Sequence, residues 1–198
     1  MARVLAEPLA APAAPRRGFT DDGLLGMALV VFTEVMLFAA FISGYVIVRI
    51  GTPPGLWPPL DQPRLPFGQT TIHTLVLLAS GVLLFLAQRA TRARGLAAAE
   101  RPLLGAILLG LYFVVAQGAE WAALLRQGLT LTSSQVGAFF YVIVGAHALH
   151  AIVAIVALSV CWLRLRAGRL KPSVFGATQF FWYFVVLVWP AIFLVVYR

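Results

Sequence analysis

Five long apolar runs dominate this sequence of 198 residues. They lie at about residues 23–48, 70–88, 103–125, 135–165 and 174–197, and each has the roughly 17–25 apolar residues that a membrane-spanning helix needs. Hydrophobic residues make up 61% of the chain and charged residues only 11%, which is more apolar surface than a soluble domain of this size could bury. The sequence therefore predicts an all-α polytopic membrane protein, with a bundle of five transmembrane helices over residues 23–198.

The Ala/Pro-rich N-terminal stretch, residues 1–22, shows no apolar periodicity and is predicted to be a flexible cytoplasmic tail. The first apolar run is too long, and begins too late, to be a cleaved signal peptide. With the N-terminus inside, the inner segments hold eleven Lys and Arg residues and the outer segments four. This bias predicts a cytoplasmic N-terminus and an external C-terminus. It also explains the net charge of +8 without nucleic-acid binding.

One carboxyl group falls in the middle of the first apolar run. Glu34 lies roughly 16 Å along the helix from Gly23, near the centre of the hydrocarbon layer. It shares a helix face with Phe38, Phe41 and Tyr45. A carboxylate at this depth costs several kcal/mol unless it is protonated, paired or turned toward protein. No basic partner for it is apparent in any span.

The other ionisable groups within the spans are few. Glu120 follows Gln117 by one helical turn, near the outer end of the third run. His147 and His150 are three residues apart and are predicted to share one face of the fourth run. His73 lies near the outer start of the second run.

These residues allow three functional interpretations and one structural interpretation. A His-x-x-His pair joined by Glu34 and Glu120 could bind a metal, but the Glu-x-x-His motif of di-iron bundles is missing. Haem ligation needs facing histidines on two helices, and Cys161, the single cysteine, excludes a cysteine-rich metal site. A membrane carboxyl group can also hold or pass a proton. The spacing alone favours a structural role, in which these polar groups bridge helices by hydrogen bonds.

Three segments together resemble the cytochrome c oxidase subunit III family of the haem–copper oxidases. The segment 26–38 resembles the family block in which a Ser-Glu pair leads through an aromatic run to a Tyr, with Thr33 in place of the Ser and Tyr45 at the end. The segment 109–121, which includes Gln117 and Glu120, resembles the Leu-Gly…Gln…Glu-Tyr/Trp block. The segment 137–150 resembles the block that ends in His-x-x-His.

A fourth point of resemblance is the Trp-Pro-Pro loop at Trp57, and the likeness covers about residues 20–198. Five spans agree with the short bacterial form of the family. The last helix departs from the family pattern, because Tyr183 and Val186 stand where the family has His and Asp. Any role that rests on that His or Asp is therefore not carried over. Val144 similarly replaces the Thr of the fourth-helix block.

The resemblance implies a non-redox accessory subunit in a bacterial inner (plasma) membrane, within a complex that reduces oxygen to water and pumps protons. It implies subunit I as the main contact, subunit II as a further partner, and haem and copper in those partners, with none bound here. It implies that the chain supports the stability of subunit I and proton uptake, and it leaves room for a structural phospholipid among the surrounding membrane lipids. Glu34 matches the family's membrane-buried, carbodiimide-reactive Glu.

Several alternatives remain open at the level of sequence. They are the related subunit of a nitric oxide reductase or a quinol oxidase, a small membrane transporter, and a membrane-integral metalloenzyme. The residues to which we assign a buried polar or proton-related role are Glu34, Glu120, His147 and His150. The residues to which we assign packing or interface roles are Tyr45, Trp57, Gln117, Trp182 and Trp189.

Overall fold

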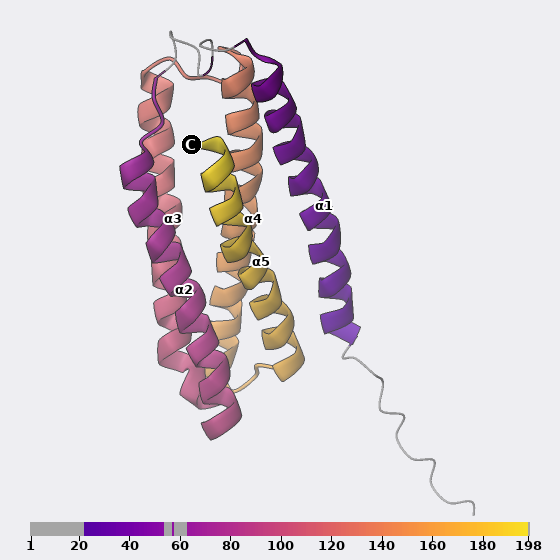
Figure 1. Ribbon diagram of the computed structural model, residues 1–198. Coiled ribbons are helices and arrows are strands. Elements are labelled where there is room, and N and C mark those ends of the chain that lie inside the picture. Colours follow the sequence, from indigo (N-terminus) through magenta and orange to yellow (C-terminus); the bar gives the residue numbers. More distant parts are fainter. Residues whose placement is uncertain (1–21, 54–56, 58–62, 198) are drawn as a thin grey trace, which may run out of the picture.

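The computed structural model describes residues 22–53, 57 and 63–197, and its five long α-helices run side by side as one elongated bundle (Figure 1). The helices are α1 (Asp22–Gly51), α2 (Phe67–Arg94), α3 (Glu100–Arg126), α4 (Gln135–Arg166) and α5 (Pro172–Val196), with a short 3₁₀ helix, η1 (Leu96–Ala99), between α2 and α3. All five α-helices are long and apolar enough to cross a membrane. The predicted fold class is therefore confirmed. The expected tail before Asp22 and most of the loop after α1 lie outside the described residues.

The helices do not end where the apolar runs end, because local residues determine their first and last turns. α2 begins at Phe67, before the expected start at Thr70, and continues past Gln88 to Arg94. Ala and Arg are good helix formers, so the helix persists where its sequence has already become too polar for the hydrocarbon layer. Gly95, with φ of +87°, then ends it in a backbone conformation that suits glycine. At the start of α4, the Ser134 hydroxyl accepts a hydrogen bond of 3.0 Å from the Gly137 amide.

Helix α5 forms the centre of the bundle. It packs against α1, α2 and α4, and 56% of the residues in its most apolar window are buried inside the molecule. The corresponding fraction for α1 is 6%, because α1 stands at one side and packs against α5 and α4 only along one face (Figure 1). Most of the α1 surface is therefore left for lipid or for another protein.

The centre of the bundle is aromatic. Trp182 and Trp189 on α5 are almost completely buried. Gly110 on α3 makes room for Trp182, since a Cβ atom at this position would lie 2.6 Å from the indole Cη2. The absence of a side chain at Gly110 thus lets α3 approach the indole closely.

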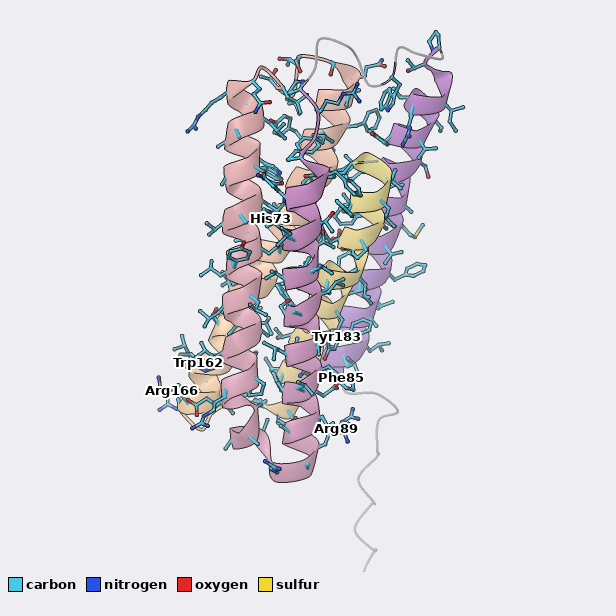
Figure 2. The ribbon with its side chains drawn as sticks, turned by 60° about the vertical axis from the view of Figure 1, so that its left-hand side comes forward. His73, Phe85, Arg89, Trp162, Arg166 and Tyr183 are labelled. Carbon is cyan, nitrogen blue, oxygen red and sulfur yellow. The ribbon has the colours of Figure 1, made fainter. Side chains whose placement is uncertain are left out.

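Basic residues collect at the end of the bundle where α2 and α4 finish and where α3 and α5 begin. They are Arg89, Arg92, Arg94, Arg101, Arg164, Arg166, Arg169 and Lys171. Figure 2 shows two of them, Arg89 and Arg166, at this end, which we call the basic end. The other end, where α5 finishes, is called the opposite end. The charge bias predicts that the basic end is cytoplasmic.

Candidate functional site

The first polar cluster joins α1 to α4 halfway along the bundle. Glu34 and His150 lie near the midpoints of their helices, and Nε2 of His150 is 3.0 Å from Oε2 of Glu34. The expectation that Glu34 has no basic partner is therefore wrong. The pattern within one run shows which residues share a face, but it does not show which helix that face meets, and here α1 packs beside α4.

The contact between Glu34 and His150 needs a proton. The other ring nitrogen of His150, Nδ1, lies 2.7 Å from the Ala146 carbonyl oxygen. Because a carbonyl only accepts, we assign the donor role to Nδ1–H, which leaves Nε2 as the basic nitrogen of the neutral ring. A lone pair on Nε2 would repel a carboxylate at 3.0 Å. A favourable contact at this distance requires one proton on the pair, either on the carboxyl group or on the ring, and a pair that holds it is electrically neutral.

Aromatic rings surround the imidazole of this pair. The Phe38 ring lies edge-on to His150 with centroids 5.5 Å apart, and Phe181 and Phe184 lie at 6.2 Å. The Glu34 side chain is nevertheless 24% exposed at the surface of the bundle. The carboxyl group is thus held by α4 on one side and can be reached from outside the chain on the other.

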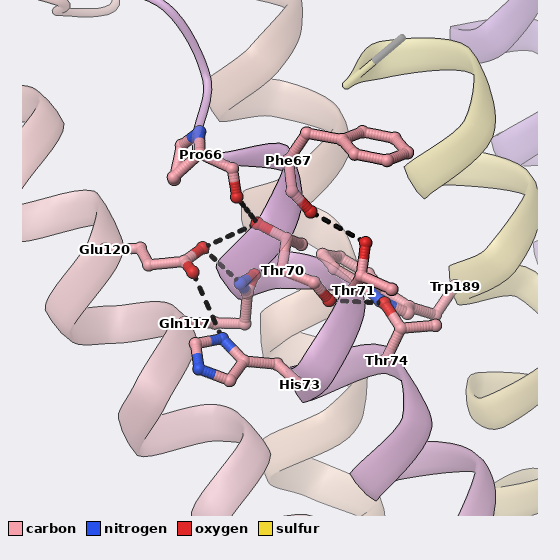
Figure 3. A network of polar contacts seen from close by, with 9 residues as sticks. All are labelled: Pro66, Phe67, Thr70, Thr71, His73, Thr74, Gln117, Glu120 and Trp189. Atoms are coloured by element: carbon pink, nitrogen blue, oxygen red, sulfur yellow. Dashed lines mark hydrogen bonds and ion pairs between the residues drawn. The ribbon is translucent and has the colours of Figure 1, made fainter.

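The second polar cluster joins α2 to α3 near the opposite end (Figure 3). Oε2 of the buried Glu120 accepts hydrogen bonds of 2.7 Å from Nε2 of Gln117 and 3.0 Å from the Thr70 hydroxyl. Its other oxygen, Oε1, lies 3.2 Å from Nδ1 of His73. Gln117, which we assigned to packing, thus binds the carboxyl group of Glu120, and His73, noted only for its place near the outer start of its run, is part of the same cluster.

A further hydrogen bond connects α2 to the centre of the bundle. The Thr74 hydroxyl donates to the Thr70 carbonyl at 2.7 Å and accepts from Nε1 of Trp189 at 2.8 Å. Thr70, His73 and Thr74 were missed as site residues at the level of sequence. Their i, i+3, i+4 spacing was the available signal, since it places three polar side chains on one face of α2.

His147 belongs to neither cluster. It is 1% exposed, and its two ring nitrogens have no hydrogen-bond partner among the described residues. Its ring lies 4.9 Å from the Trp189 ring and about 6 Å from Phe38 and Phe113. The two histidines are therefore not used as one pair of ligands, because only His150 has an acidic partner. Over residues 22–53, 57 and 63–197, no three His, Cys, Asp or Glu side chains come together as metal ligands.

Comparison with known proteins decides the family. The sequence model of a family described as cytochrome c oxidase subunit III matches residues 16–198. The chain belongs to the cytochrome c oxidase subunit III family. It is therefore an accessory, non-redox subunit of a haem–copper oxidase and works in a complex with other oxidase subunits.

Relatives from distant organisms share most of the chain. It is 30% identical over 176 residues to the probable cytochrome c oxidase subunit 3 of Mycobacterium leprae, covering 87% of this chain and 86% of that one. The human and Artemia franciscana subunits 3 are 32% and 31% identical, each over 87% of this chain and 67% of their own length. A bacterial and two animal subunits are thus each similar to most of this sequence.

Two of the departures from the subunit III pattern lie on α5. Val186 is buried against Gly81 of α2, where a Cβ atom would come within 3.1 Å of its Cγ1. Tyr183 lies in the half of the bundle nearer Arg89 (Figure 2), and its buried hydroxyl has no hydrogen-bond partner within the described part of the chain. The α2–α5 contact at Val186 is therefore apolar and closely packed in this subunit.

Proposed function

We propose that this chain is subunit III of a bacterial respiratory haem–copper oxidase that reduces oxygen to water and pumps protons. Its main contact is subunit I, and subunit II is a further partner in the same complex. Haem and copper are held by those partners. The proposed location is the bacterial inner membrane, which the similarity to the Mycobacterium leprae protein supports.

Within that complex, we assign the chain a role in proton uptake and in the stability of subunit I. The observation that carries this assignment is the Glu34–His150 pair. Its two groups lie 3.0 Å apart at the middle of the bundle, where a favourable contact requires one shared proton and leaves the pair neutral, and the Glu34 side chain is 24% exposed. Release of that proton leaves one negative charge on the pair, so the pair can pass a proton to a neighbouring subunit only while it takes up another. The Glu120 cluster, in which Oε2 accepts two hydrogen bonds and Oε1 lies 3.2 Å from the His73 ring, has the geometry of a structural bridge.

Purification of the complex through a tag on this chain tests the proposal. We expect haem a and copper to co-purify, together with subunits I and II, and the spectrum of the complex to show both haem a centres. Haem b with non-haem iron would instead assign the chain to a nitric oxide reductase, and a haem b oxidase without a cytochrome c site would assign it to a quinol oxidase. Purification of the chain with no partner would contradict the accessory role.

The proton-related part needs a separate measurement. Oxygen consumption of the Glu34→Gln complex is followed at several pH values beside the wild-type complex. We expect the variant to lose part of its turnover, most clearly where proton supply limits the rate. A Glu120→Gln complex with the same pH profile as Glu34→Gln would contradict the division of roles between the two carboxyl groups.

A further inference from the structure

An open groove runs between α2 and α3 on the outer surface of the bundle, in the half nearer the opposite end. It has a volume of about 420 Å³ and is lined by residues of both helices. On α3 the lining includes Ala116, Ala119 and Ala123, whose i, i+3, i+7 spacing places them along one helix face. Such a row lets a second helix approach closely in a membrane. Acyl chains also fit against alanine, so the polar residues of the groove decide what covers it.

The polar residues of this groove are Glu120 and His73. The carboxyl group of Glu120 is 93% buried or more, and its Oε1 lies 3.2 Å from the buried Nδ1 of His73. The His73 side chain is 14% exposed, and Figure 3 shows its second ring nitrogen, Nε2, pointing away from the cluster. No residue in the described part of the chain forms a hydrogen bond with Nε2. The imidazole therefore presents one polar atom without a partner to the outside of the bundle.

The depth of His73 makes this open nitrogen costly. The hydrocarbon layer accommodates about 20 helical residues, so a span that ends at Gln88 begins near Gln69. His73 then lies roughly 6 Å inside the layer, where water is scarce. A second proton on the ring balances the charge of the Glu120 carboxylate and makes Nε2 a hydrogen-bond donor. The neutral cluster thus needs an uncharged acceptor on its outer side.

We propose that this groove is the docking site for a transmembrane helix of another oxidase subunit, which places a serine, threonine or tyrosine hydroxyl against Nε2 of His73. A hydroxyl oxygen accepts the hydrogen bond and adds no charge to the neutral cluster. An acidic or basic side chain would bring an unbalanced charge into the hydrocarbon layer, and acyl chains offer no acceptor. The alanine row lets the partner helix come close enough for this contact. The proposal rests on the membership of this chain in an oxidase complex.

Photo-crosslinking in the tagged complex tests the docking site. Ile72, which is 59% exposed and lines the groove, is replaced by a photoreactive benzoyl-phenylalanine. Membranes are irradiated before solubilisation, and the adducts are identified by mass spectrometry. We expect an adduct with a transmembrane peptide of another oxidase subunit that contains a hydroxyl residue. Adducts with lipid alone, with a second copy of this chain or within the chain itself would overturn the proposal.

Filling the groove gives an independent measurement. Ala119 is exposed, so Ala119→Trp places an indole in the path of the partner helix and not in the core of this chain. We expect retention of the cross-linked subunit after a detergent wash to fall about tenfold. Leu125→Trp is the matched control, because this exposed residue of α3 lies outside the groove lining. Unchanged retention in Ala119→Trp, or an equal loss in both variants, would overturn the proposal. If the Ala119→Trp chain does not accumulate, the cross-link from Ile72 decides.

The contact with Nε2 has its own variant. In His73→Asn the amide can still reach Oε1 of Glu120 in place of Nδ1, but no group remains at the position of Nε2. We expect retention of the partner to fall about threefold, which is the usual effect of one hydrogen bond between helices in a membrane. Retention equal to that of the wild type would contradict the contact. A wild-type chain without any partner would contradict membership in an oxidase complex, whereas a complete complex that ignores both substitutions would contradict the docking site alone.

Discussion

At the scale of single residues, the pairing of Glu34 with His150 determines what a substitution does. The Nδ1–H of His150 is already used by the Ala146 carbonyl, so Nε2 needs a donor opposite it. A carboxyl group can be that donor only when it is protonated, or the ring must carry the proton itself. A side-chain amide, in contrast, can donate a hydrogen bond to Nε2 while it remains uncharged and without taking up a proton.

We therefore expect Glu34→Gln to assemble normally and Glu34→Ala to assemble poorly. The glutamine amide can donate to Nε2 of His150, whereas alanine leaves the imidazole without its partner, at a cost of about 1–3 kcal/mol. The measurement is the amount of tagged subunit that purifies with the rest of the complex. If both variants assembled equally well, the pair would have no part in holding α1 against α4.

The same variants locate the proton. If it resides on the carboxyl group, the wild-type complex has an infrared carbonyl band of a protonated acid that disappears in Glu34→Gln. If it resides on the ring, the band is absent and the imidazolium signal of His150 is present instead. A complex with neither signal would contradict the assignment of a proton to the pair.

A second prediction at this scale concerns Val186. Replacement by aspartate places a carboxylate against Gly81 in an apolar contact, and an unpaired buried charge costs about 3 kcal/mol or more. We expect Val186→Asp to lower the thermal stability of the complex strongly, as measured by loss of solubility on heating. Val186→Thr is the control, because it keeps the branched shape and brings a hydroxyl that can bond within its own helix. Equal stability of the two variants would show that a polar partner lies near this position.

The residues of both clusters were only partly predictable. Glu34, Glu120 and Gln117 stand out because a polar group is rare in a span and therefore visible. Their partners His150 and His73 could also be identified in the sequence. The pairing itself could not be predicted, because it depends on which helices pack side by side. Thr70 and Thr74 were harder to identify, because threonine is common in spans and often bonds only to its own helix.

At the scale of helices, Gly110 controls how closely α3 approaches α5. Its neighbour is the far edge of the buried Trp182 indole, which has no free space to turn into. Gly118 is on the same helix two turns later, and no atom lies within 4 Å of the position of its missing Cβ. The two glycines thus differ in packing and not in secondary structure.

We expect Gly110→Ala to destabilise the bundle by about 1–3 kcal/mol, because a methyl group there overlaps the indole. Gly118→Ala should be neutral or stabilising by up to about 1 kcal/mol, since alanine favours the helix. Thermal unfolding of both variants, followed by tryptophan fluorescence, gives the comparison. A destabilised Gly118→Ala would mean that this face of α3 is covered by a partner in the complex.

The existence of five helices was predictable, because each apolar run exceeds the length of a span. The ends of the helices were less predictable. They depend on Gly95, Ser134 and Pro172, and on how far Arg-containing turns continue as helix beyond the hydrocarbon layer. The periodicity of apolar residues says little about where these helices end, because in lipid both faces of a helix can be apolar.

At the scale of the whole molecule, the positions of the basic residues predict which end faces the cytoplasm. Cys161 is buried and is the only cysteine of the chain. Labelling of a single introduced cysteine by a thiol reagent therefore shows whether that position is accessible from a given side of the membrane. Gln127, after α3, is exposed at the opposite end, and Ala167, after α4, is exposed at the basic end.

We expect an impermeant maleimide added to intact spheroplasts to label Gln127→Cys and not Ala167→Cys. In inverted membrane vesicles the pattern should reverse. The unmodified chain, with Cys161 alone, gives the background. Labelling of Ala167→Cys in intact spheroplasts would reverse the predicted orientation of the bundle.

Because Glu34 and His150 are far apart in sequence, Glu34 is synthesised well before its partner. The ribosome adds His150 more than 100 residues after Glu34, which at about 5–20 residues per second is an interval on the order of 10 s. During this interval α1 has left the ribosome and its carboxyl group has no imidazole to meet. We therefore expect the newly inserted α1 to depend on the insertion machinery, or on a proton taken up before α4 arrives, for longer than any other helix of this chain.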